Sequence, residues 1–95
     1  MTKIKVKTII WEEWNIKHIK KHNIVPSEVT EVGSSLIYHQ KTRKERYIAI
    51  GRSGTRLITL ILSRKDTGTY YLVTARDSNK KERRRVYDKE KQKNI

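Results

Sequence analysis

Apolar and polar residues alternate in several stretches of the chain, and each alternation predicts a β-strand. The first stretch, KIKVKTII at residues 3–10, alternates lysine with aliphatic residues, which is the two-residue period of a half-buried strand. Lysines on the outward face are typical of a sheet edge, where charge discourages aggregation. We therefore expect an edge strand within residues 1–10.

A helical period of apolar residues follows over residues 12–32 and predicts two helices. For the first, Glu12 to Lys21, a rotation of about 100° per residue gathers several large side chains on one side. These are Trp11, Trp14, Asn15, His18 and His22, with Ile19 adjoining. Asn23 can end this helix in a left-handed conformation, and Pro26 suits the first turn of a second helix that reaches about Val32.

Four further apolar stretches predict an antiparallel meander over residues 34–76. They are SLIYHQ, RYIAIG, LITLILS and TYYLVTAR, with the turns KTRKE, RSGT and RKDTG between them. LITLILS is apolar on both faces, so we expect it at the centre of the sheet. In the last strand, alternation would set Tyr70, Leu72, Thr74 and Arg76 on one face.

A basic helix is expected over residues 79–91, at the end of the chain. Asn79 with Glu82 three residues later resembles a capping box at its start. Only Val86 and Tyr87 are apolar in it, so the helix should dock by a narrow seam. The order of elements predicts a single α+β domain over residues 1–95, in which helices and one sheet form a sandwich.

The net charge is +13, from 23 Lys and Arg against 10 Asp and Glu. The charge is clustered, because residues 24–40 contain no Lys or Arg, whereas 41–56 and 76–95 are rich in both. Clustering favours a surface that binds a polyanion, and nucleic acid is the obvious one. A highly soluble protein, or one neutralised by an acidic partner, is the alternative.

Several classes of protein are excluded or disfavoured by composition. The chain has no Cys, which excludes disulfides and thiolate zinc sites. No segment approaches the roughly 18 apolar residues that a membrane span requires. The basic N-terminus is followed by WEEW rather than by a small-residue cleavage site, so we expect a cytoplasmic protein without membrane association.

His18 and His22 stand four residues apart, a spacing that can hold zinc on one helix. The strong zinc signal, HExxH, has a glutamate between its histidines, whereas two lysines lie here and would repel a cation. We therefore expect no metal site. His18 is interpreted as a core residue, and His22 as a residue of the rim that could touch RNA.

Several short motifs follow one another along residues 10–88. They are Trp14-Asn15, His18-Ile19, His22, Val25-Pro26, Glu28-Val29, Arg46-Tyr47, Ile50-Gly51, Thr74 to Asp77, and Lys81 to Arg84, ending near Tyr87. In these motifs the chain resembles the BrnT-type toxins of bacterial type II toxin–antitoxin pairs, in particular a branch whose first helix reads WNxxHIxxHxVxPxEV. The resemblance implies a RelE-like ribonuclease-toxin architecture and RNA cleavage without a metal or other cofactor. It also implies a ribbon-helix-helix antitoxin, through which operator DNA could be bound.

Metal-free RNA cleavage needs a base for the 2′-hydroxyl, cations for the phosphorane and an acid for the leaving oxygen. Arg46 and Arg76 suit the cationic role, because a guanidinium can bind two phosphate oxygens and both residues lie at predicted strand ends. We expect these two groups to converge on the scissile phosphodiester. The alternative for each is a salt bridge, to Glu45 or Glu82.

The candidates for proton transfer are Glu45, His39, Glu82 and Tyr87, and His22 is a further one. The sequence does not show which of them acts as the base or the acid. The remaining basic residues would contact phosphates without reading sequence. They are Lys41, Arg43 and Lys44 in the predicted turn, and Arg83 and Arg84 on the last helix. The leading hypothesis is an endoribonuclease toxin that inhibits translation. The rivals are a non-enzymatic nucleic-acid-binding module and a degenerate toxin that serves to bind its antitoxin.

Overall fold

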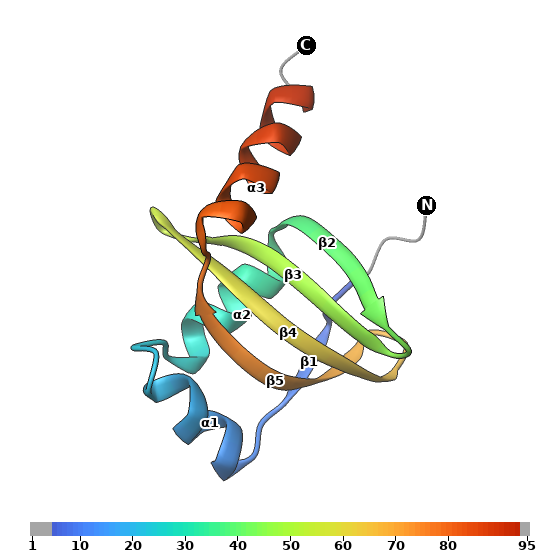
Figure 1. Cartoon of the computed structure of the whole chain (residues 1–95). Helices are drawn as coiled ribbons and strands as arrows, with labels where there is room; N and C mark the ends of the chain where they lie inside the picture. The colour runs from blue at the N-terminus through green and yellow to red at the C-terminus, as the bar shows by residue number, and fades with distance from the viewer. Residues whose placement is uncertain (1–4, 94–95) are drawn as a thin grey trace.

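The computed structural model describes residues 5–93 and has the predicted α+β order of elements (Figure 1). The elements are β1 (Thr8–Ile10), α1 (Glu13–Lys20), α2 (Pro26–Ser34), β2 (Leu36–Arg43), β3 (Arg46–Ser53), β4 (Arg56–Asp66), β5 (Thr69–Asp77) and α3 (Lys80–Lys93). The edge strand is shorter than predicted, since residues 5–7 are not in a strand and the first four residues of the expected span lie outside the described ones.

The strands form one sheet in the order β1-β5-β4-β3-β2, so β4 is central, as its apolar sequence predicts. β2 to β5 form the expected antiparallel meander, and β1 pairs with β5 in parallel at the edge. Backbone amides of Lys7 and Thr8 donate to the Gly68 carbonyl at 2.9 and 3.0 Å. The positive φ angles of Gly54 and Gly68, +62° and +79°, close the β3–β4 and β4–β5 turns.

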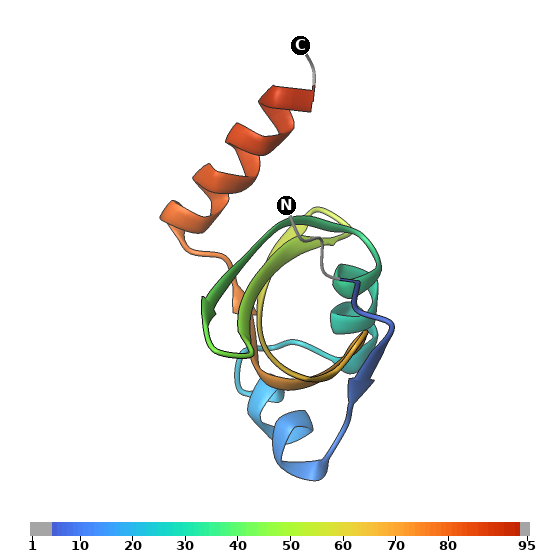
Figure 2. The same ribbon diagram turned by 90° about the vertical axis from the view of Figure 1, so that its right-hand side faces the viewer.

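The main core lies on the concave face of the sheet, which curves around α2 (Figure 2). Helices α1 and α2 cover this face, and their apolar side chains interdigitate with those of the strands. The buried members are Ile19, Ile24, Val29, Val32, Ala49, Ile58, Leu60, Leu62, Tyr70, Leu72 and Ala75. Gly51 lets α2 approach β3 closely, because a Cβ there would lie 3.0 Å from the Val32 carbonyl oxygen.

Helix α3 packs on the opposite, convex face and projects beyond the sheet (Figure 1). Val86 is fully buried there against Ile50 and Leu57. Tyr87 is 51% exposed and is not among the buried residues of the seam. The narrow docking predicted for this helix is therefore correct, with one apolar residue rather than two.

The alternation predicted for the last strand is interrupted by a β-bulge at Val73. Ile61 pairs with Thr74 and Leu62 with Leu72, which leaves Val73 without a partner on β4. The extra residue reverses the faces beyond it, so that Ala75 enters the core behind Leu72. Thr74 and Arg76 therefore lie on the convex face rather than with Tyr70 and Leu72, and the predicted set is wrong at these two positions.

The β2–β3 turn is also tighter than predicted. Strand β2 runs to Arg43, so Lys41 and Arg43 belong to the strand, and only Lys44 and Glu45 form the turn. Glu45 takes a left-handed conformation with φ +58°, as does Asn23, with φ +57°, after α1. The left-handed ending at Asn23 is as predicted.

Candidate nucleic-acid interface

Side chains on the convex face of the sheet form three rows across the strands, because residues directly opposite one another in antiparallel strands point to the same side. The hairpin row, next to the β2–β3 turn, contains Arg43, Arg46, Ser63 and Tyr71. The middle row contains Gln40, Ile48, Ile61 and Thr74. The helix row contains Tyr38, Ile50, Thr59 and Arg76.

These rows differ in how far they are covered. α3 lies over the helix row, where Val86 packs on Ile50 and the Arg85 guanidinium lies 5.6 Å from the centre of the Tyr38 ring. The middle and hairpin rows are half-buried or exposed, and no described helix lies over them in Figure 1. The convex face is thus open at the end away from α3.

Six cations lie at this end of the sheet, which we name the hairpin end: Lys41, Arg43, Lys44, Arg46, Arg64 and Lys65. Arg43 and Arg46 point to the convex face, whereas Lys41 and Arg64 stand opposite the core residues Tyr47 and Tyr70 and point to the concave side. A backbone hydrogen bond of 2.7 Å, from the Arg64 amide to the Glu45 carbonyl, holds the two hairpins together there. None of the six takes part in the salt bridges formed among residues 5–93. Their charge is therefore available to an anion, and their number favours a polyanion.

Arg76 is engaged by a different group, the carboxylate of Glu82 on α3. Two guanidinium nitrogens of Arg76 donate to Glu82 at 2.6 and 2.8 Å, and the Asn79 amide and Thr59 hydroxyl donate at 2.8 and 3.1 Å. We name these four residues the Glu82 clasp. Glu82 is only 6% exposed, whereas the Arg76 side chain is 34% exposed.

The clasp sets the protonation state of its members. Burial raises the pKa of Glu82, but the hydrogen bonds from Arg76, the Asn79 amide and Thr59 outweigh it, so the pKa is lower than the ordinary value of 4.5. The same ion pair raises the pKa of Arg76. Glu82 also completes the predicted capping box, since the Asn79 side chain accepts from its backbone amide at 2.9 Å. A carboxylate so fully bonded anchors α3 and is not placed to transfer protons.

Arg46 and Arg76 share a face but do not converge. Their partners on the central strand, Ser63 and Thr59, are four residues apart, and the arginines lie on strands two apart. Strand geometry puts their Cα atoms about 16 Å from each other. Arg76 is also held by Glu82 on α3, so the structure does not bring the two guanidinium groups to one phosphodiester as expected.

The other candidates for catalysis are scattered as well. Glu45 is in the turn beside Arg46, whereas Tyr87 is on α3, near Arg52. His22 follows α1, beyond the concave face, and its carbonyl accepts a hydrogen bond of 3.1 Å from Arg56. Among these candidates the structure bonds Arg76 to Glu82, whereas Glu45 and Arg46 are adjacent in the sequence.

His18 on α1 and His22 after it are both exposed, with ring centres 5.8 Å apart, so the core position predicted for His18 is wrong. Asn15 and Ile19 are the residues of α1 that are buried. The Asn15 amide donates to the Ile10 carbonyl at 3.0 Å and its oxygen accepts from the Glu12 amide at 2.9 Å. Among residues 5–93 no three metal-ligating side chains are grouped.

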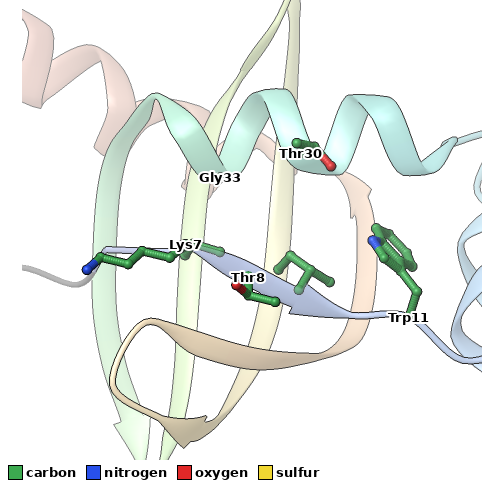
Figure 3. A pocket seen from close by; sticks show the side chains of 7 residues that line it. Lys7, Thr8, Trp11, Thr30 and Gly33 are labelled. Atoms are coloured by element: carbon green, nitrogen blue, oxygen red, sulfur yellow. The ribbon is translucent and has the colours of Figure 1, made fainter.

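A pocket of about 220 Å³ lies between β1 and α2 (Figure 3). It is lined by Val6, Lys7, Thr8, Ile9, Trp11, Thr30 and Gly33. The Lys7 amine points away from it, and no carboxylate or imidazole lines it. This pocket offers no group for proton transfer near neutral pH.

The predicted phosphate-binding residues fall into two places. Lys41, Arg43 and Lys44 are exposed at the hairpin end, whereas Arg83 and Arg84 are exposed on α3 at the other end of the sheet. Tyr71, Arg64 and Lys65 were not anticipated. Alternation alone put Tyr71 on the face opposite Arg76, because the bulge between them leaves no signal in the sequence.

Neither a family model nor a curated protein matches the chain. Among solved structures, the crystal structure of the Brucella abortus ribonuclease toxin BrnT superposes with a TM-score of 0.63 and 24% identity. The match covers 77% of this chain and 97% of that one. The chain has the fold of this ribonuclease toxin. No helix in the described part is long and apolar enough to cross a membrane.

Proposed function

We propose that the chain is a ribonuclease toxin that binds RNA through the hairpin end. The observation that carries this proposal is the set of six cations there, which have no ion-pair partner within residues 5–93 and two of which, Arg43 and Arg46, point to an uncovered sheet face. The fold shared with a BrnT toxin supports the step from RNA binding to RNA cleavage.

The chemistry would centre on Arg46 and Glu45. The Arg46 guanidinium would hold the phosphate and stabilise the charge that develops on it, and the neighbouring Glu45 carboxylate would accept the proton of the 2′-hydroxyl. Arg76 could reach RNA only with the N–H groups that Glu82 leaves open. The toxin would be neutralised by a ribbon-helix-helix antitoxin, whose acidic groups would cover the same cations and which could bind operator DNA.

Purified protein tests the proposal directly. We expect cleavage of RNA in the presence of EDTA, and a loss of about 10²–10³ in rate for Arg46→Gln, the typical effect of removing one preorganised donor. Lys17→Gln is the matched control, because Lys17 is an exposed cation on α1 whose partner, Glu13, is also exposed. Equal cleavage by Arg46→Gln and Lys17→Gln would remove the hairpin end from the active site.

A second candidate, a nucleic-acid-binding module without catalysis, is favoured by one observation. The Cα atoms of the two arginines expected to share a phosphate are about 16 Å apart by strand geometry, and one of the arginines is bound to Glu82. RNA binding without cleavage, and no growth arrest when the chain is expressed, would support the module over the toxin.

A further inference from the structure

We infer that an unpaired RNA base stacks on Tyr71, which makes single-stranded RNA the ligand of the hairpin row. The inference rests on the proposed function and names the ligand class of the same surface. Arg46, Ser63 and Tyr71 are consecutive members of that row on β3, β4 and β5. With strands about 4.8 Å apart, roughly 10 Å separates the arginine from the tyrosine. One extended nucleotide strand could therefore touch both.

The two neighbouring tyrosines show why Tyr71 is the binding candidate. Tyr70 is 3% exposed and packs edge-on against Tyr47, with ring centres 5.9 Å apart, so its role in the core is clear. Tyr71 points to the convex face, where no described helix covers it, and it is half-buried among residues of the sheet surface. The main core therefore does not explain Tyr71.

The charge around Tyr71 fits a nucleotide. The Lys65 amine lies 5.7 Å from the ring centre, and Arg46 stands in the same row. A base stacked on the ring would thus have cations close to its own phosphates, which is the combination of aromatic platform and basic groove found in single-strand binders. In the middle row, Ile48 and Ile61 are half-buried and offer an apolar surface to a second base.

A duplex cannot use these features in the same way. Its bases are stacked on each other inside the helix, so it would meet the sheet mainly through phosphates and 2′-hydroxyls. An open sheet face with an aromatic ring instead suits bases that are splayed out of a single strand. The geometry therefore distinguishes unpaired from paired RNA.

The test is the affinity of the full chain for a fluorescein-labelled oligoadenylate of about ten nucleotides, a length within the usual site sizes, measured by fluorescence anisotropy. Tyr71→Leu should weaken binding roughly 5- to 150-fold, the range that base stacking contributes, while Tyr71→Phe should bind nearly as well as the wild type. The slope of the logarithm of the association constant against the logarithm of the salt concentration should be unchanged in Tyr71→Leu. In Arg46→Gln its magnitude should be smaller by about 0.7, because only the arginine would neutralise a phosphate.

Trp14→Leu is the control, since Trp14 is a 50% exposed aromatic residue on α1, beyond the concave face. Tyr71→Val provides a second variant in case Tyr71→Leu does not fold, because a β-branched side chain suits a strand. Stacking is refuted if the folded Tyr71→Leu or Tyr71→Val variant binds the oligonucleotide as Trp14→Leu does, or loses the same factor in affinity for an RNA duplex. Tyr71-dependent binding without any cleavage would uphold the inference and refute the ribonuclease; no binding by the wild type would refute both.

Discussion

The Glu82 clasp should be a main determinant of stability, and Glu82→Ala tests it. The substitution removes the acceptor for four hydrogen bonds at a position only 6% exposed. Breaking a buried ion pair by removing one partner typically destabilises by about 3–5 kcal/mol. Arg76 is one-third exposed and can regain water, so we expect the lower end of that range, a loss of about 3 kcal/mol in the free energy of unfolding.

Urea unfolding followed by circular dichroism measures this loss. With an m value of about 1.5 kcal/mol/M, a loss of about 3 kcal/mol lowers the midpoint by about 2 M. Glu82→Gln should be milder, because its amide oxygen can still accept one of the bonds. The control is Glu13→Ala, which deletes a carboxylate whose partner, Lys17, is 72% exposed and should change the free energy by no more than about 0.5 kcal/mol.

The contribution of the Glu82 carboxylate to stability should depend on pH. Because folding lowers the pKa of Glu82, its contribution is fully present above the ordinary value of 4.5 and is lost as the pH falls through the folded pKa. The difference in stability between the wild type and Glu82→Ala should therefore shrink as the pH falls below about 4.5. A difference in stability that stayed constant down to strongly acidic pH would refute the stabilising role of the Glu82 clasp. The same conclusion would follow if Glu82→Ala were as stable as Glu13→Ala at pH 7.

Three further substitutions test other parts of the fold, each by its urea midpoint. Gly51→Ala should lower the free energy of unfolding by about 1–3 kcal/mol, because the new Cβ would lie 3.0 Å from the Val32 carbonyl oxygen, a backbone atom that cannot rotate away. Unchanged stability would contradict this packing. Glu45→Gly should be as stable as the wild type or slightly more stable, because glycine suits φ +58°, and it should lose RNA cleavage if Glu45 is the base. Arg56→Gln should lower the free energy of unfolding by about 1–2 kcal/mol, because Arg56 joins Asp77 and Glu28 to the loop after α1. A loss no larger than that of Lys17→Gln would show that this network does not stabilise the fold.

Local patterns in the sequence were sufficient for the sheet. The all-apolar stretch at β4 identified the central strand, and the turn glycines, Asn23 and the Asn79–Glu82 box marked the ends of elements correctly. These signals depend on the residues beside them and on few others. The bulge at Val73 depends on pairing between strands, so a strict two-residue period could not reveal it.

The first helix shows a second limit of pattern analysis. The core face of the first helix was predicted to be the side that carries the large aromatic and imidazole rings, which includes His18. The buried residues of α1 are instead Asn15 and Ile19, about 100° further around the helix. Asn15 can be buried because both ends of its amide are hydrogen-bonded to backbone. An eight-residue helix buries so narrow a stripe that a shift of one position exchanges core and surface.

Arg76 and Glu82 belong to the motifs on which the resemblance to BrnT toxins depends, yet in this structure they hold α3 to the sheet. A sequence motif can thus be explained by the attachment of a helix that has only one fully buried apolar residue, Val86, without any part in catalysis. The clasp and the hairpin end lie at opposite ends of the convex face, so their effects can be separated: variants of the clasp act on the free energy of unfolding, and variants of Arg46 or Tyr71 act on RNA. An effect of Arg76→Gln on cleavage therefore counts as catalytic only where the urea midpoint shows that the clasp variant remains folded in the assay.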